Sequence, residues 1–92
     1  MAEKIAQNSL ANCREGEVLI IERIDGRGAL KKRLLEMGLV PGSIIEIVKY
    51  APLMDPMEVV TRGARMSLRV SEAMRIIVTP DGITPGEERS GK

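Results

Sequence analysis

Apolar and polar residues alternate along much of the chain, and this period of two is typical of strands. The segment 17–24 (EVLIIERI) is rich in β-branched residues, with Val18, Ile20 and Ile24 expected on one face. Shorter segments of the same character follow at 44–50, 57–62, 66–70 and 76–79. The pattern therefore predicts five short strands.

One segment has helical periodicity instead. Residues 29–37 (ALKKRLLEM) place Leu30, Leu34 and Met37 at the spacing of one helix face, with Leu35 at its margin. Apolar residues at this spacing usually face a core, so we expect Leu30 and Leu34 to be buried. Because Leu35 lies off the stripe, it is expected to be partly exposed.

Glycine and proline mark the ends of the predicted elements. Gly38 stands directly after the helix, so we expect a Schellman ending in which Leu39 folds back toward Leu34. Residues 40–43 (VPGS) have proline and glycine at the central positions that a type II turn requires. Residues 63–65 (GAR) are predicted to form the turn of a β-hairpin.

Consecutive short strands with tight connections favour antiparallel pairing, and closing such a sheet removes its exposed edges. We predict a mainly β domain, a small SH3-like antiparallel β-barrel with a short helical insertion after the first strand. The domain is expected to span residues 9–79. Residues 1–8 are expected to form a flexible N-terminal extension and residues 80–92 a disordered tail, since neither has a sustained apolar pattern.

Composition disfavours several classes of function. The 92 residues contain no His and one Cys, Cys13, so the commonest catalytic base, a CxxC redox pair and the usual metal ligands are missing. The one aromatic residue is Tyr50 and the net charge is +1, which disfavours nucleic acid as a partner. The sequence has neither a GxxxxGK(S/T) motif nor an apolar run of membrane-spanning length. We expect a cytoplasmic binding module without enzymatic activity, cofactor or metal site.

Two motifs at a fixed spacing carry a family resemblance. Residues 30–42 read LKKRLLEMGLVPG, and APLMDP follows at 51–56, about ten residues later. A Gly-Glu pair at 16–17 opens the first strand, and SLR stands at 67–69. In this order the motifs resemble the FeoA family, ferrous iron transport protein A, over about residues 10–78.

The resemblance implies a role in iron transport. Family members look like SH3-like barrels with a helical insertion, in agreement with the pattern above. They resemble cytosolic accessories of FeoB, a membrane ferrous-iron permease with a GTP-binding domain. The resemblance thus implies binding to the permease's cytosolic part and support of its assembly or GTPase cycle. The protein would contact the membrane only indirectly, through the permease. A weak homo-oligomer remains an alternative to a monomer. Binding of a transition metal ion is implied only for the family as a whole.

The alternative is a regulatory interaction module, because a similar domain occurs at the C-terminal end of metal-dependent transcription repressors. Without a helix-turn-helix or metal-binding helices, the chain fits the transporter accessory better. A third role, GTPase activation with Arg27 or Arg33 as an arginine finger, has less support because nothing in the spacing singles out either residue.

The candidate partner surface combines the end of the helix with the 51–56 loop. Two prolines stiffen this loop, so exposed apolar groups on it would lose little entropy on docking. Asp55 is interpreted either as a cap of its own turn or as a partner contact. The expected partner-binding residues are Arg33, Leu35, Met37, Pro52, Leu53, Met54, Asp55 and Pro56.

Basic residues gather between positions 23 and 33. This segment contains five basic residues and one acidic residue, Asp25, so its local charge is +4 in a chain of net charge +1. Such a patch can steer association with an acidic partner, although a solvated helix face is the other interpretation. The basic residues are Arg23, Arg27, Lys31 and Lys32, together with Arg33.

Overall fold

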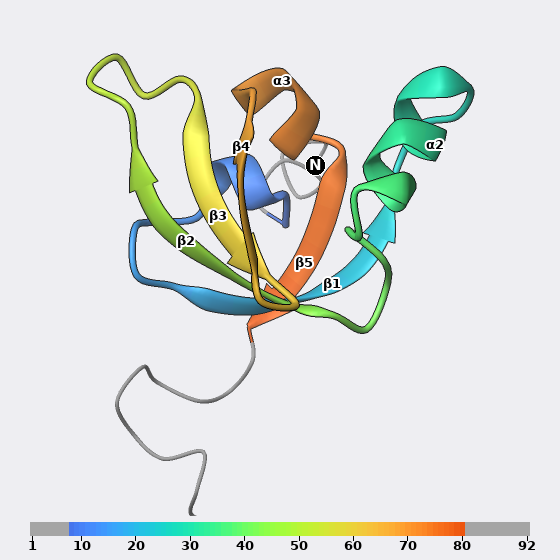
Figure 1. Ribbon diagram of the computed structural model, residues 1–92, viewed down its shortest axis with the longest axis horizontal. Coiled ribbons are helices and arrows are strands. Elements are labelled where there is room, and N and C mark those ends of the chain that lie inside the picture. The colour runs from blue at the N-terminus through green and yellow to red at the C-terminus, as the bar shows by residue number, and fades with distance from the viewer. Residues whose placement is uncertain (1–7, 81–92) are drawn as a thin grey trace, which may run out of the picture.

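The computed structural model describes residues 8–80, which form a curved antiparallel sheet with short helices packed beside it (Figure 1). The predictions for residues 1–7 and 81–92 lie outside the described residues. In chain order the elements are η1 (Leu10–Asn12), β1 (Val18–Ile24), α2 (Ala29–Glu36), β2 (Ile44–Tyr50), β3 (Met57–Thr61), β4 (Ala64–Leu68), α3 (Val70–Ala73) and β5 (Ile76–Pro80).

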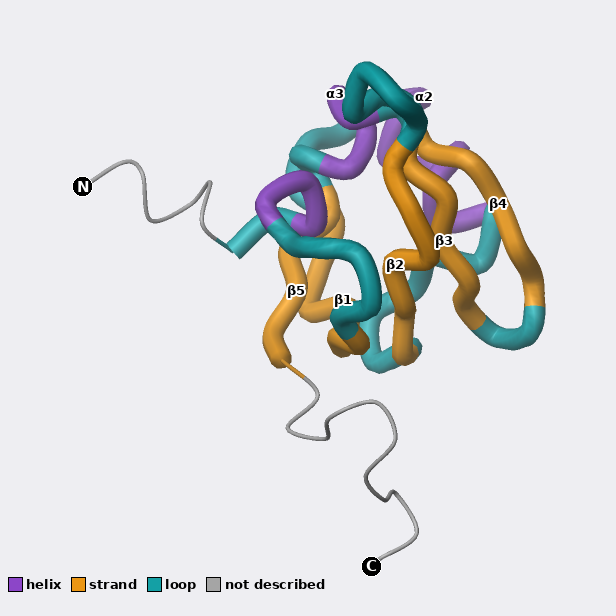
Figure 2. The backbone as a smooth tube through the Cα atoms, turned by 90° about the vertical axis from the view of Figure 1, so that its left-hand side faces the viewer, coloured by secondary structure: helices purple, strands orange, loops and turns teal. Residues whose placement is uncertain are grey.

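The strands pair antiparallel in the order β4-β3-β2-β1-β5. The sheet curls round its apolar face like the wall of a barrel (Figures 1 and 2). Its outer strands, β4 and β5, do not pair with each other, and the chain passes between them through α3. The predicted mainly β antiparallel fold is confirmed, as a barrel that stays open between these two strands.

The core lies on the inner face of the curled sheet. Leu34 of α2 is fully buried there, as predicted, whereas Leu30 is only partly buried against it. Burying one such side chain favours folding by about 1.5–3 kcal/mol. The largest fully buried side chains are Leu10, Ile21, Leu34, Leu39, Ile45, Ile47, Met57, Leu68, Ile76, Ile77, Val59 and Thr61.

Strand β1 departs from simple alternation. Its register with β5 shifts between Ile21 and Arg23. The extra residue of this bulge reverses which face the following side chains occupy. Ile24 is therefore buried together with Leu19 and Ile21. The prediction that Ile24 lies on the opposite face is therefore wrong.

The end of α2 has the predicted Schellman geometry. Gly38 has a φ of +100°, the Leu39 N–H donates to the Leu34 carbonyl at 3.2 Å, and the Gly38 N–H donates to the Leu35 carbonyl at 3.0 Å. The predicted turn at 40–43 also forms, with a 3.1 Å hydrogen bond between its ends. The helix therefore stops sharply and returns the chain to the sheet.

The hairpin between β3 and β4 is tighter than predicted. Arg62 (φ 54°) and Gly63 (φ 82°) both adopt the left-handed conformation and form a two-residue turn. Because Arg62 belongs to the turn, β4 begins at Ala64. The predicted turn at 63–65 and the strand at 66–70 were thus placed too late in the chain.

The domain boundaries move slightly at both ends. Pro80, which was predicted to belong to the tail, is the last residue of β5 and pairs with Leu19. The carbonyl of Asn8, assigned to the extension, accepts a 2.8 Å hydrogen bond from the Val78 N–H. Backbone pairing therefore draws both residues into the domain.

Candidate partner-binding site

The 51–56 loop follows β2 and carries the two most exposed large apolar side chains of residues 8–80. Leu53 is 88% exposed and Met54 59% exposed. The Ala51 N–H donates to the Pro56 carbonyl at 2.9 Å, and the Met54 N–H donates to the Ala51 carbonyl at 2.7 Å. The loop thus presents both side chains to solvent on a backbone held by internal hydrogen bonds.

Asp55 ties this loop to α3. Its Oδ1 accepts a 3.0 Å hydrogen bond from the Val70 N–H, the first residue of that helix. A carboxylate at this position satisfies an N–H that has no partner within the helix. Asp55 therefore caps α3 and not its own turn, as one interpretation had it, and its role as a partner contact stays a prediction.

Glu72 joins α2 to α3. Its side chain is only 10% exposed, and its Oε2 lies 2.7 Å from the Arg33 Nη1 on α2. Its Oε1 accepts a 2.9 Å hydrogen bond from the Arg69 N–H. A carboxylate this deeply placed needs both partners to offset its loss of water. This ion pair therefore adds a polar contact between α2 and α3 to the burial of Leu34 in the core.

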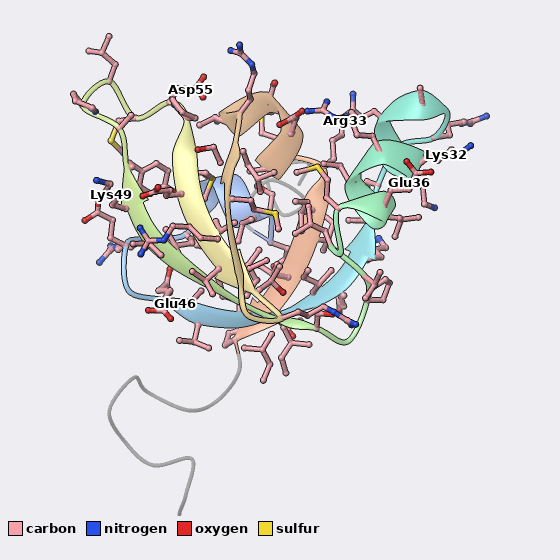
Figure 3. All side chains as sticks on the ribbon, in the orientation of Figure 1. Lys32, Arg33, Glu36, Glu46, Lys49 and Asp55 are labelled. Atoms are coloured by element: carbon pink, nitrogen blue, oxygen red, sulfur yellow. The ribbon has the colours of Figure 1, made fainter. Side chains whose placement is uncertain are left out.

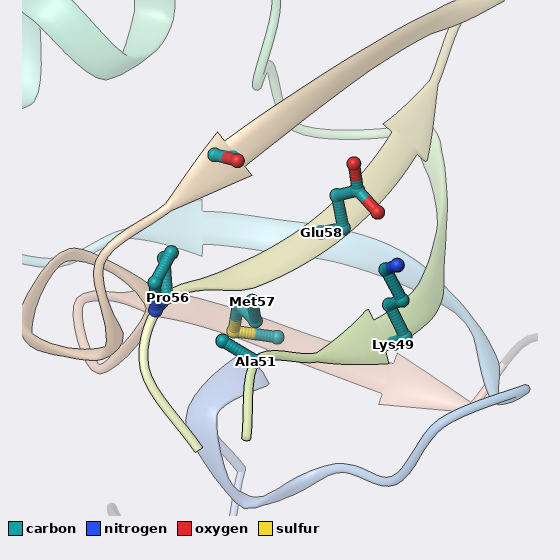
Figure 4. A pocket seen from close by; sticks show the side chains of 6 residues that line it. Lys49, Ala51, Pro56, Met57 and Glu58 are labelled. Atoms are coloured by element: carbon teal, nitrogen blue, oxygen red, sulfur yellow. The ribbon is translucent and has the colours of Figure 1, made fainter. Parts of the chain in front are cut away.

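Two hollows adjoin each other beside these contacts. The larger has a volume of about 300 Å³ and is lined by Arg33, Pro56, Ser67, Leu68, Arg69 and Glu72. The smaller, of about 190 Å³, is lined by Lys49, Ala51, Pro56, Met57, Glu58 and Ser67 (Figure 4). Since both share Pro56 and Ser67, we call them together the β4 groove.

The structure brings only some of the expected partner-binding residues together. Arg33 and Pro56 line the same hollow, and Figure 3 shows Arg33 and Asp55 toward the same end of the molecule. Leu35 and Met37 are instead partly buried against the core and line neither hollow. Of the expected residues on α2, Arg33 therefore lines the β4 groove, and the apolar residues at the end of the helix do not.

The basic segment is less strongly charged than its sequence suggests. Arg23 forms a 2.9 Å ion pair with Asp25 and lies 3.6 Å from Glu22, while Arg33 is paired with Glu72. Both glutamates lie outside the 23–33 window. Lys32 projects from the outer side of α2 (Figure 3). Within the described chain, part of the predicted patch is therefore neutralised locally.

Ser67, Arg69 and Glu72 line the larger hollow and were not predicted from the sequence. SLR at 67–69 carried the family resemblance, but nothing in its spacing pointed to the 51–56 loop or to α2. One feature of the sequence could have indicated the role of Glu72. It follows Arg69 by three residues, the spacing at which a glutamate accepts the N-cap N–H in a capping box. The groove forms only when segments distant in sequence fold together.

Residues 8–80 offer neither a metal-ligand cluster nor a membrane-spanning helix. No three His, Cys, Asp or Glu side chains in this range lie close enough to hold a metal ion. None of its helices has the length and apolar character needed to cross a membrane.

Cys13 lies in a segment that is bonded to the end of β2. The Tyr50 hydroxyl donates to the Cys13 carbonyl, and the Tyr50 N–H donates to the Glu15 Oε2 at 2.8 Å. Burial, followed by the charge of Glu17, raises the pKa of Cys13 to about 11. Burial also raises the pKa of Tyr50, with further contributions from Cys13, Glu17 and Glu15.

Cys13 is therefore expected to resist alkylation. A shift from the usual 9.0 to about 11 makes its thiolate about 100-fold scarcer at pH 8 than that of an ordinary thiol, and iodoacetamide should react correspondingly slowly. The rate should rise about tenfold per pH unit until pH 11 and return to normal in urea. Because folding raises the pKa of Cys13, the protonated thiol contributes to the free energy of unfolding. This contribution is complete below pH 9 and is lost as the pH rises through 11. Mass spectrometry would measure the rate, and an ordinary rate at pH 8 in the folded protein would contradict the prediction.

Known proteins resemble this chain in sequence. Residues 8–80 match the FeoA domain. An Fe(2+) transport protein A/Fe(2+) transporter FeoB fusion protein of Porphyromonas gingivalis is 41% identical over 69 residues. That match covers 75% of this chain but only 8% of the fusion protein.

Solved structures agree with the sequence matches. Iron(II) transport protein A from Clostridium thermocellum is 38% identical with a TM-score of 0.77, over 80% of this chain and 46% of that one. Stenotrophomonas maltophilia FeoA complexed with zinc, described as a prokaryotic SH3 domain protein, is 28% identical with a TM-score of 0.68, over 76% and 87% of the two chains. A FeoA structure described as an iron uptake regulatory protein is 28% identical with a TM-score of 0.71, over 77% and 93%.

These likenesses confirm the predicted SH3-like fold with its helical insertion. The matched segment coincides with the folded domain, from the Asn8 carbonyl that pairs with β5 to the end of β5 at Pro80. The chain belongs to the FeoA family, a family linked to ferrous iron transport.

Proposed function

We propose that this protein is a cytoplasmic, non-enzymatic accessory of ferrous iron uptake that binds the cytosolic part of an FeoB-type permease. The observation that carries the proposal is the Porphyromonas gingivalis protein, in which a similar domain and FeoB share one chain. Such a linkage keeps two domains at effective concentrations of about millimolar. A separate chain needs an interface of its own to reach a comparable degree of association.

The 51–56 loop and the adjoining hollow suit such an interface. Leu53 and Met54 are exposed apolar groups on a loop that Asp55 holds against α3. Arg33 and Arg69 line the hollow beside the loop and provide a polar rim. Binding through this surface supports assembly of the permease or its GTPase cycle.

The test measures binding first and GTP turnover second. The full chain is titrated by calorimetry into the purified cytosolic part of the FeoB permease of the same organism, and GTP hydrolysis is then followed with and without it. We expect saturable binding. Binding with unchanged turnover would indicate a role in assembly, whereas no binding to the cytosolic part or to the whole permease in detergent would contradict the proposal.

A regulatory module is the second candidate function. It is supported by the FeoA structure described as an iron uptake regulatory protein. In this role the chain would bind a transcription repressor rather than the permease. Parallel pull-downs from the same lysate with the tagged full chain, probed for permease and for repressor, distinguish the two candidates.

A further inference from the structure

We propose that the open edge of β4 binds an extended, acidic segment of a protein partner, which joins the sheet as an additional strand. This inference deepens the proposed function and rests on it, since it takes the partner to be the cytosolic part of the permease. Four features of the domain support it: the two sheet edges, the backbone of β4, the β4 groove and the charges beside it.

The two edges of the sheet differ in how far they are covered. At the β5 edge, Ser9 forms a bridge with Ile77, and the Val78 N–H donates to the Asn8 carbonyl at 2.8 Å. β4 pairs with β3 on one side, and no described strand pairs with the other side. Figure 2 shows β4 at the outer margin of the described domain. Within residues 8–80, β4 therefore provides the edge that is open to another chain.

The backbone of β4 offers hydrogen-bonding groups at this edge. Thr61 and Ala64 close the two-residue turn as a hydrogen-bonded pair, and every second residue of β4 from Ala64 onward bonds to β3. The residues between them, Arg65 and Ser67, direct their N–H and C=O groups outward. β4 has no proline, and its register with β3 has no bulge, so these two common protections of an edge are absent.

The β4 groove lies beside these outward-facing groups. Ser67 lines both hollows, and the larger hollow also includes the apolar Pro56 and Leu68. In strand addition, backbone hydrogen bonds supply affinity while pockets receive alternate side chains of the added strand. The edge and the groove together provide both elements of this mode of binding.

The charges along the edge favour an acidic occupant. Arg62, Arg65 and Arg69 are all exposed, and among residues 8–80 only Glu58, 3.5 Å from Arg65, forms an ion pair with one of them. An added strand with acidic side chains would meet this remaining positive charge. A second copy of β4 would instead bring the same arginines face to face, which disfavours self-pairing.

A proline at position 67 tests the backbone pairing directly. Ser67→Pro removes an outward N–H but leaves the hydrogen bonds between β4 and β3. Ser67→Val is the matched control, because it changes the side chain and keeps the N–H. We expect Ser67→Pro to bind the permease's cytosolic part about tenfold or more weakly than Ser67→Val, since both variants alter the lining of the groove but only proline removes the N–H.

Hydrogen exchange of the unmodified full chain gives a second readout that does not depend on the variants. Binding of the permease's cytosolic part is expected to slow exchange at the Arg65 and Ser67 amides. If Ser67→Pro fails to fold, the exchange rates of these two amides alone decide whether the partner adds as a strand. Binding that leaves both amides and the Ser67→Pro affinity unchanged would overturn strand addition while the proposed function stands.

A synthetic peptide of alternating Glu and Val separates the remaining outcomes. If the permease part does not bind but the peptide slows both amides, strand addition is correct and the proposed function is wrong. If neither binds, both are wrong. If the protein alone forms dimers that Ser67→Pro abolishes, the occupant is a second copy of the chain and the proposal is overturned.

Discussion

Replacing Leu34 with aspartate is expected to leave the protein without a stable folded state. Leu34 is fully buried, so the change removes core packing worth about 2–5 kcal/mol and buries a carboxylate with no partner. Domains of this size have a total stability of about 5–15 kcal/mol, and small ones lie toward the lower end. Far-ultraviolet circular dichroism during heating and urea titration would detect the loss of a cooperative transition.

Lys32→Asp is the matched control for this prediction. It places the same carboxylate on the same helix, at a side chain exposed to water. Its effect on the free energy of unfolding should stay below about 1 kcal/mol. A Leu34→Asp protein that still unfolded cooperatively, near the temperature of the control, would show that Leu34 does not belong to the core.

Replacing Leu53 with aspartate is expected to affect binding and leave the fold intact. If Leu53 anchors the permease, the loss should be about 2 kcal/mol or more, equivalent to about 30-fold in affinity. The thermal midpoint should change little, because the side chain is 88% exposed and leaves no cavity. Calorimetric titration with the permease's cytosolic part measures the first quantity, and thermal unfolding measures the second.

Ile44→Asp serves as the control for an exposed apolar residue elsewhere. Ile44 is 47% exposed and begins β2, whereas the loop follows the end of that strand. Its affinity for the permease part should stay within about threefold of the parent chain. If Leu53→Asp remains folded and binds unchanged, the interface lies elsewhere, and the basic segment 23–33 becomes the next candidate. If Leu53→Asp instead yields no folded protein, Leu53 belongs to the core.

Local sequence signals predicted most of the fold. Alternating β-branched residues located the strands, and Gly38 located the helix end, because few other residues adopt its backbone conformation without strain. The errors occur where local rules have exceptions. A bulge in β1 leaves no trace in composition, and Arg62 takes a left-handed conformation that non-glycine residues seldom adopt.

The candidate site was predicted less completely because its contacts join distant segments. Prolines on both sides of Leu53 and Met54 predicted a stiff loop, and these two side chains are exposed as expected. No local pattern encodes that Asp55 reaches the first residue of α3, or that Arg33 meets Glu72. The β4 groove depends on these ties, so it could be found only in the folded chain.

The hydrogen bond from Val70 to Asp55 has a consequence for how the 51–56 loop can vary. The segment is held at Ala51 by the Met54 N–H and at Asp55 by α3, so an inserted or deleted residue would break one of these bonds. Side chains at positions 53 and 54 take part in neither bond. The loop is therefore fixed in length, and position 54 is further restricted because the φ of Met54, 69°, is a left-handed conformation that few residues adopt. Position 53 lacks this restriction, so recognition by the loop can diverge there between relatives while the scaffold stays the same.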